Sequence, residues 1–123
     1  MANSVVLTAG MAEILERSLG LVPNGTLYVA VGTSSSAANS SQVSLGSEIA
    51  RVLASASIVA GNKATIKGFF TTAQANSSIS EAGLVTKSTE GVLIERGIEV
   101  PSLVKDTTRE MIVEKVITLV PIT

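Results

Sequence analysis

The Gly61-Asn62 pair constrains the fold more than any other local feature of this sequence. It lies between two short stretches of apolar and β-branched residues, 57–60 and 63–66. A glycine in the first position of a two-residue turn can adopt the positive φ that a tight hairpin needs. The sequence therefore predicts an antiparallel β-hairpin at this place, and a chain built at least partly from antiparallel strands.

Other strand-length apolar segments follow one another along the chain, with turn-forming residues between them. Residues 26–32 predict a short central strand buried on both faces. Residues 49–56 fit either one face of a helix or a long strand that continues into the hairpin, and the spacing of Ser and Ala favours the strand. Three further extended segments are expected, the second of them ended by Pro101, at 78–85, 92–100 and 111–120.

One amphipathic helix is expected near the start of the chain, over residues 8–19. Thr8 can cap its first turn, and Gly20 can close it in a left-handed conformation. Apolar residues recur at three- and four-residue spacing and should form the face that packs on a sheet or a partner, namely Met11, Ile14, Leu15 and Leu19.

These segments together predict the fold class. Six or so strands and one helix, without regular alternation, exclude a doubly wound α/β fold. We expect a mainly β, sandwich-like single domain over residues 1–123 with one N-terminal α-helix. Residues 33–44 are rich in Ser and Ala and should form an exposed loop or an extended arm. The strand 111–120 is apolar on both faces, which is typical of a strand inside a sandwich or against a neighbouring subunit.

The composition removes many function classes. The 123 residues include no Cys and no His, which excludes thiol nucleophiles, imidazole bases and Cys/His metal sites. Nine Lys and Arg against ten Asp and Glu, mixed along the chain, leave no basic surface for nucleic acid. The uncharged stretch 18–47 is broken by Pro23 and Gly25, so no membrane span is expected. Residues 1–4 lack the basic start of a secretory signal, which favours synthesis in a cytoplasm.

Glu95 and Glu99 are the strongest candidates for chemistry, because they share one face of a predicted strand with Gly97 between them. Two facing acids can act as an acid and a base or bind a hard cation. Arg96 and Pro101 beside them favour instead a solvated edge strand whose charges discourage pairing. We therefore predict no enzyme and assign no catalytic, cofactor-binding or metal-binding residue. A carbohydrate-binding module would have to use the three aromatic residues Tyr28, Phe69 and Phe70.

The order of several segments resembles a domain of virion proteins in tailed bacteriophages, especially small tail or baseplate proteins and fibre-attachment regions. The segments that carry the resemblance are Leu27–Thr33, Leu45–Arg51, Ile79–Leu84, Gly91–Arg96 and Lys105–Leu119. The resemblance implies a non-enzymatic structural protein, present in the virion after assembly in the host cytoplasm. It implies binding to other virion proteins and to itself, as a homotrimer, without a cofactor or a small-molecule substrate.

Two positions in such a particle remain open. The resemblance favours a tail or baseplate component or a fibre-attachment domain, whereas the short chain fits a capsid decoration protein. The expected contact elements are residues 33–44, the apolar face of the predicted helix and the strand 111–120, because a small domain that acts in an assembly needs interfaces rather than a catalytic site.

Overall fold

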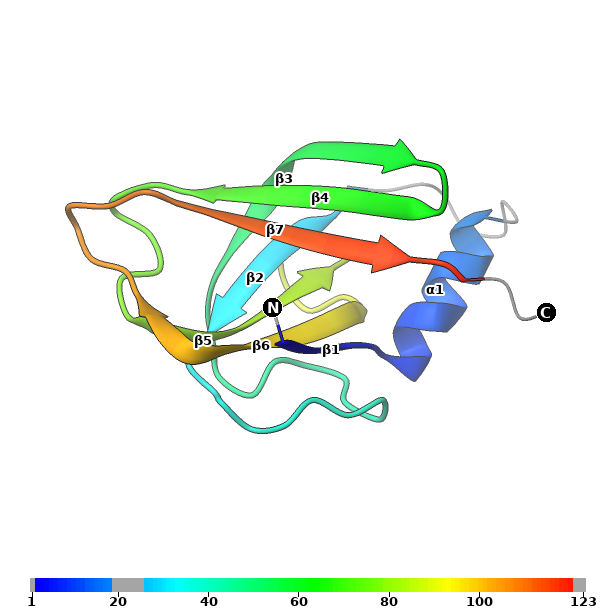
Figure 1. The fold of residues 1–123 in the computed structure, drawn as a ribbon, viewed down its shortest axis with the longest axis horizontal. Helices are drawn as coiled ribbons and strands as arrows, with labels where there is room; N and C mark the ends of the chain where they lie inside the picture. Colours follow the sequence, from blue (N-terminus) through cyan, green and yellow to red (C-terminus); the bar gives the residue numbers. More distant parts are fainter. Residues whose placement is uncertain (1, 19–25, 121–123) are drawn as a thin grey trace.

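The computed structural model describes residues 2–18 and 26–120 of the chain (Figure 1). The described part is mainly β, with one helix, which confirms the expected fold class. Its elements are β1 (Ala2–Val6), α1 (Thr8–Ser18), β2 (Tyr28–Gly32), β3 (Glu48–Ala60), β4 (Lys63–Phe70), β5 (Ser78–Val85), β6 (Leu93–Val104) and β7 (Met111–Thr118). The strands form one antiparallel sheet in the order β1-β6-β5-β2-β3-β4-β7.

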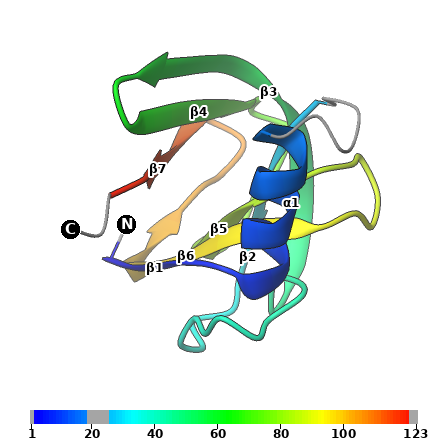
Figure 2. The same cartoon turned by 90° about the vertical axis from the view of Figure 1, so that its right-hand side faces the viewer.

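The sheet curls so that its two ends form two layers that share β3. The first half of β3 pairs with β2, and its second half pairs with β4, with an irregular register between Ala54 and Ala56. We call β1, β6, β5 and β2 with the first half of β3 the first layer, and the rest of β3 with β4 and β7 the second layer. Figure 2 shows the two layers one above the other, with α1 across one end of the curl.

The main core lies between the two layers. Val29 and Val31 of β2 point into it together with Ile66 and Phe70 of β4 and with Leu84 of β5, and all five side chains are buried. The expected position of the second strand is confirmed, since β2 is the middle strand of the sheet and four of its five residues are buried. A second cluster lies on the outer side of the first layer, formed by Leu7, Ala30, Leu45, Val85 and Leu93.

The hairpin and the long strand before it are confirmed. Ala60 pairs with Lys63 across the turn, and Gly61 has a φ of 60°. The region 49–56 is strand, as its Ser and Ala spacing favours, and it runs without a break into the hairpin as β3. β5 has the predicted bounds, 78–85.

Three expectations about the strands need correction. The sequence does not predict β1, because its five residues include Asn3 and Ser4 and show no apolar alternation. This segment forms a strand by pairing with β6. β6 continues through Pro101, where a strand end is expected. The register there is irregular, with Ile79 and Glu81 of β5 opposite Leu103 and Ile98 of β6, and a proline in such a bulge interrupts no ladder hydrogen bond. The strand predicted at 111–120 ends at Thr118.

The helix starts at Thr8 as predicted, but Leu7 occupies the capping position, since its carbonyl accepts a hydrogen bond from Met11 N. Leu19 and Gly20 lie outside the described residues. The packing face also differs from the prediction, because Met11 and Leu15 are exposed, Leu15 by 61%. The reason is Gly10, which lies directly against the backbone of Ile94 and brings that side of the helix onto β6.

Gly10→Ala should destabilise the fold, although Ala is the better helix former by about 1 kcal/mol. The added Cβ would collide with the carbonyl oxygen of Ile94, which is backbone and cannot rotate away. We expect a loss of about 1–3 kcal/mol in the free energy of unfolding, measured by urea denaturation. An unchanged or increased stability would show that α1 does not pack on β6 through this residue.

Candidate functional site

The carboxylate of Glu81, on β5, accepts four hydrogen bonds. The side chain is fully buried on the outer face of the first layer. It accepts hydrogen bonds from Arg96 Nε at 2.8 Å and from the backbone N–H groups of Ser47, Gly46 and Ser34 at 2.7, 2.8 and 3.2 Å. Glu81 therefore fixes both ends of the loop between β2 and β3 to the sheet.

Arg96, on the neighbouring strand β6, completes this cluster. It is as buried as Glu81, and its Nη1 donates to the carbonyl oxygen of Ser36 at 2.9 Å and to Gln42 Oε1 at 3.4 Å. A further contact joins the loop to the helix start, where Thr8 N donates to Ser40 O at 3.0 Å. The segment 33–44 is mostly exposed, as predicted, but it is a loop fastened to the sheet and not an extended arm.

The hydrogen bonds keep Glu81 ionised. Burial alone raises the pKa of this carboxyl. The hydrogen bonds from Arg96 and from the three backbone N–H groups lower the pKa by more than burial raises it, so that it lies below its ordinary value of 4.5. A Cβ at Gly32 would collide with Glu81 Oε2, so a side chain at residue 32 has no room beside the carboxylate. Both carboxylate oxygens thus have partners within the chain, and this arrangement serves the fold rather than a bound substrate.

Three of the five segments on which the expected phage resemblance rests meet at this cluster. Ile79–Leu84 supplies Glu81, Gly91–Arg96 supplies Arg96, and Leu45–Arg51 supplies the N–H groups of residues 46 and 47. Sequence reasoning did not single out Glu81 or Arg96 as partners. The available signal was a charged residue inside each of two apolar segments, which predicts a buried pair only once the two strands are known to be neighbours.

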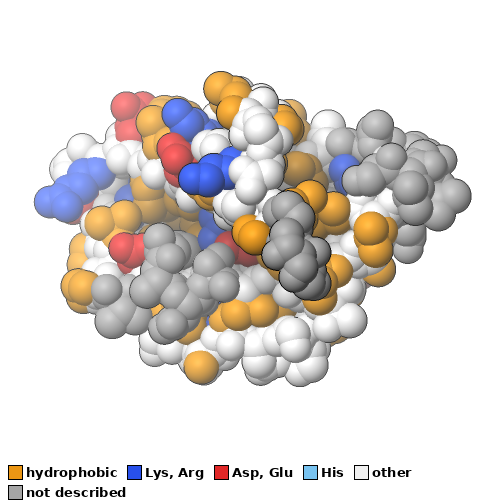
Figure 3. All heavy atoms as spheres, turned by 45° about the vertical axis from the view of Figure 1, so that its right-hand side comes forward, with side chains coloured by type: hydrophobic (Ala, Val, Ile, Leu, Met, Phe, Trp, Pro, Cys, Tyr) orange, Lys and Arg blue, Asp and Glu red, His pale blue; other side chains and the backbone are white. Residues whose placement is uncertain are grey.

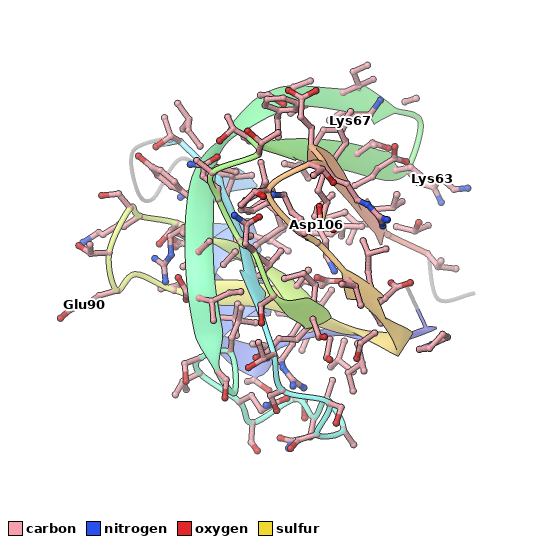
Figure 4. All side chains as sticks on the ribbon, turned by 90° about the vertical axis from the view of Figure 1, so that its left-hand side faces the viewer. Lys63, Lys67, Glu90 and Asp106 are labelled. Carbon is pink, nitrogen blue, oxygen red and sulfur yellow. The ribbon has the colours of Figure 1, made fainter. Side chains whose placement is uncertain are left out.

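Arg51 fastens the turn between β5 and β6. Its guanidinium forms two hydrogen bonds with the Glu48 carboxylate, at 2.8 and 2.7 Å, and its Nη1 donates to the carbonyl oxygens of Lys87 and Glu90 at 2.7 and 2.8 Å. Figure 4 shows Glu90 at the tip of this turn. Such bidentate arginine contacts restrict orientation, so the last residue of the segment Leu45–Arg51 also holds the shape of the domain.

A second buried ion pair lies in the core between the layers. Lys115 Nζ of β7 is 2.8 Å from Glu95 Oε1 of β6, and both side chains are only 2% exposed. The same ammonium donates to the carbonyl oxygen of Ala82 at 3.3 Å. Because β6 and β7 are not neighbours in the sheet, this pair joins the two layers across the open side of the curl.

The interpretation of Glu95 and Glu99 as charges on a solvated edge strand is wrong. β6 lies between β1 and β5, so its edge is covered, and Glu95 is buried beside Lys115. Glu99 is partly buried and lines a separate groove with Met111 and Val113. Within residues 2–18 and 26–120, no group of three or more acidic residues is placed to hold a metal ion.

The aromatic residues do not form a common surface. Phe70 is fully buried in the core, Phe69 points to the opposite face of β4, and Tyr28 lies in β2, in the other layer. A sugar-binding platform needs aromatic faces exposed side by side. The arrangement therefore gives no support to a carbohydrate-binding module.

The outer side of the second layer carries an exposed apolar surface. It consists of Ile58, Phe69, Ile112 and Val116, and we call it the apolar outer face. Phe69 lies opposite Ile112, and Thr65 separates Ile58 from Val116. Lys67 and Glu114 form an ion pair of 3.8 Å across the middle of this face, and Figure 4 shows Lys63 and Lys67 on β4. The strand predicted to be apolar on both faces is so in the structure, since Ile112 is 66% exposed and Met111 is buried.

Apolar side chains also line two adjoining hollows along α1, with volumes of about 380 and 410 Å³. Ile14 and Ile117 contribute to both, and the exposed Met11 and Leu15 contribute to the second. Figure 3 shows hydrophobic side chains reaching this side of the molecule in several patches, beside a group of charged side chains. The helix thus presents the apolar side chains of Met11 and Leu15 outward.

The single helix in the described part of the chain has 11 residues, fewer than the roughly 20 that a bilayer requires.

Comparisons with family models, with curated proteins and with solved structures each find no match for this chain.

Glu81→Gln should lower the free energy of unfolding by about 3–5 kcal/mol at pH 7, because it leaves Arg96 buried without its charge partner. Because the pKa of Glu81 is lower in the folded state, its contribution is complete above the ordinary value of 4.5 and decreases as the pH falls through the folded-state pKa. The free energies of unfolding of the unaltered protein and of Glu81→Gln should therefore converge below pH 4.5, as measured by urea denaturation from pH 7 to 3. Glu114→Gln, in an exposed pair, is the control and should cost under about 1 kcal/mol.

Lys115→Met should destabilise the fold by about 3–5 kcal/mol, since Glu95 would lose its ammonium partner inside the core. The double variant with Glu95→Leu removes both charges and should recover most of this loss. Thermal and urea unfolding of the three proteins measure the difference. Equal losses in the single and double variants would contradict the assignment of this pair to the closed interior.

Proposed function

We propose that this chain is a non-enzymatic structural protein of a tailed bacteriophage virion, a tail or baseplate component or fibre-attachment domain that acts through protein–protein interfaces. The apolar outer face is the observation that carries the proposal. Four large apolar side chains exposed on one side of a three-stranded layer favour burial against another protein.

The contacts of the charged side chains support a structural role. Glu81 and Arg96 fasten a loop, Glu95 and Lys115 join the layers, and Arg51 holds a turn. Each of these groups has its partners within the chain, in contrast to catalytic groups, which are aimed into a cavity. Since three of the five segments that carry the resemblance meet around Glu81, the resemblance concerns in part residues that define the shape of the domain.

The proposed partners are other virion proteins and further copies of this chain, in a particle assembled in the host cytoplasm. The contact elements are the apolar outer face and the exposed side of α1. The loop 33–44 is a weaker candidate than its sequence suggested, because several of its backbone groups already bind the sheet and the helix start.

Quantitative mass spectrometry of purified particles tests the role directly. We expect this chain at a few hundredths of the copy number of the major capsid protein, as for a tail component. A ratio near one would show a capsid decoration protein instead, and absence from the particles would overturn the virion role.

Ile112→Lys should reduce incorporation of this protein into particles, because it replaces an exposed apolar side chain of the apolar outer face with a charge. Leu53→Lys makes the same change at an exposed position of the first layer, outside both contact elements, and serves as the matched control. Both residues are exposed, so both variants should keep the stability of the unaltered protein, which urea denaturation checks. Incorporation of Ile112→Lys at the unaltered level would exclude the apolar outer face as the contact with the particle.

A further inference from the structure

β3 extends past its partner in the first layer. β2 pairs with β3 as far as Leu53, and Ala54 N donates to Leu27 O at 2.9 Å. Residues 56–60 of β3 pair on one side with β4, and Ser55 lies at the irregularity just before them. No residue in the described part of the chain pairs with the other side of residues 55–60. Figure 1 shows this half of β3 at the margin of the second layer, beside β4. The backbone groups along this edge therefore have no strand partner among residues 2–18 and 26–120.

Beyond the irregular register at Ser55, this edge has neither charges nor prolines to prevent pairing between molecules. The stretch 54–60 reads Ala-Ser-Ala-Ser-Ile-Val-Ala, without a charge, a proline or a glycine. Residues 55–60 are exposed on both faces, Ile58 by 65% and Val59 by 77%. By contrast, the free edge of the second layer at β7 carries Glu114 and the inward-pointing Lys115, and an inward-pointing charge is a known device against edge pairing.

The geometry of the hairpin determines which backbone groups face outward. Because a two-residue turn joins Ala60 to Lys63, these two residues form a hydrogen-bonded pair. Alternation along the strand then directs the N–H and C=O groups of Ser57 and Val59 away from β4, to the free edge.

An identical strand in antiparallel orientation fits this edge. Two copies of one strand paired in this way are related by a two-fold axis, which is the commonest symmetry of protein dimers. With the axis at Ser57, Ser57 lies opposite its own copy, and Val59 lies opposite Ser55 of the second copy. Ile58 then lies opposite Ala56 of the second copy, so that a large side chain meets a small one on the same face.

We infer that residues 55–60 of β3 bind the same edge of a second copy of this chain, joining the second layers of two molecules into one continuous sheet. This inference rests on the proposed structural role and names one of its partners. The pairing brings the apolar outer faces of both copies onto the same side of the joined sheet. A two-fold contact gives dimers, so the homotrimer implied by the phage resemblance would need a different contact.

A single introduced cysteine tests this pairing, because the chain contains no Cys. In the paired edge, the two Ser57 Cα atoms lie roughly 5.5 Å apart, within the range that a disulfide spans. Mild oxidation of the Ser57→Cys variant should convert most of the protein into a covalent dimer. Ile112→Cys, equally exposed but distant from the edge in the sheet order, is the control and should stay monomeric on a denaturing gel.

Ser57→Pro removes an edge donor while leaving the hydrogen bonds to β4 in place, and Val59→Lys adds a charge at the same edge. By analytical ultracentrifugation, the unaltered protein should have the mass of two chains, and both variants the mass of one, with circular dichroism confirming their fold. A monomeric or trimeric unaltered protein would overturn the inference. This result is independent of the particle copy number, so failure of the edge pairing and failure of the virion role are distinguishable.

Discussion

The buried carboxylate of Glu81 is the interaction on which the arrangement of the first layer depends. Burying a carboxylate costs roughly several kcal/mol unless charged and polar hydrogen-bond donors replace the water that it loses. Arg96 and three backbone N–H groups supply these donors. Two of those N–H groups belong to Gly46 and Ser47, which follow Leu45 directly, so the same contacts hold Leu45 over Ala30 in the second cluster. A loop of small polar residues, with little apolar surface of its own, thus obtains a fixed course.

One irregularity in β6 allows both ion pairs to exist. Val85 lies opposite Leu93 and Leu84 lies opposite Glu95, so β6 contributes one extra residue, Ile94, at this point. The bulge changes the alternation, and two consecutive charges are used on opposite faces of the sheet. Glu95 points between the layers to Lys115, while Arg96 points outward to Glu81. If the same residues formed a regular strand without a bulge, Glu95 would lie on the same side as Leu93, away from Lys115.

The sequence predicts those elements whose signal is local. The hairpin at Gly61, the buried strand at 26–32 and the strand 78–85 follow from turn chemistry and apolar pattern within a few residues. β1 and the packing face of α1 depend instead on β6, which is distant in the sequence. β1 forms a strand by pairing with β6, and α1 packs on β6 through Gly10. The cluster at Glu81 depends on three segments separated by 15 to 47 residues, so no short-range pattern could reveal it.

The second layer has a different balance of forces from the first. Its inner face is ordered by Phe70 and Ile66 in the core and by the Lys115 ion pair, but the half of β3 beyond residue 54 is exposed on both faces and gains little from burial. Two-stranded ribbons are marginal in water on their own, and β7 is the third strand that supports this hairpin. Further hydrogen bonds could form at the edge of β3, and further apolar area could be buried on the apolar outer face. A neighbouring molecule that covered this layer would bury both features at once, since the exposed half of β3 and the apolar outer face belong to the same three strands.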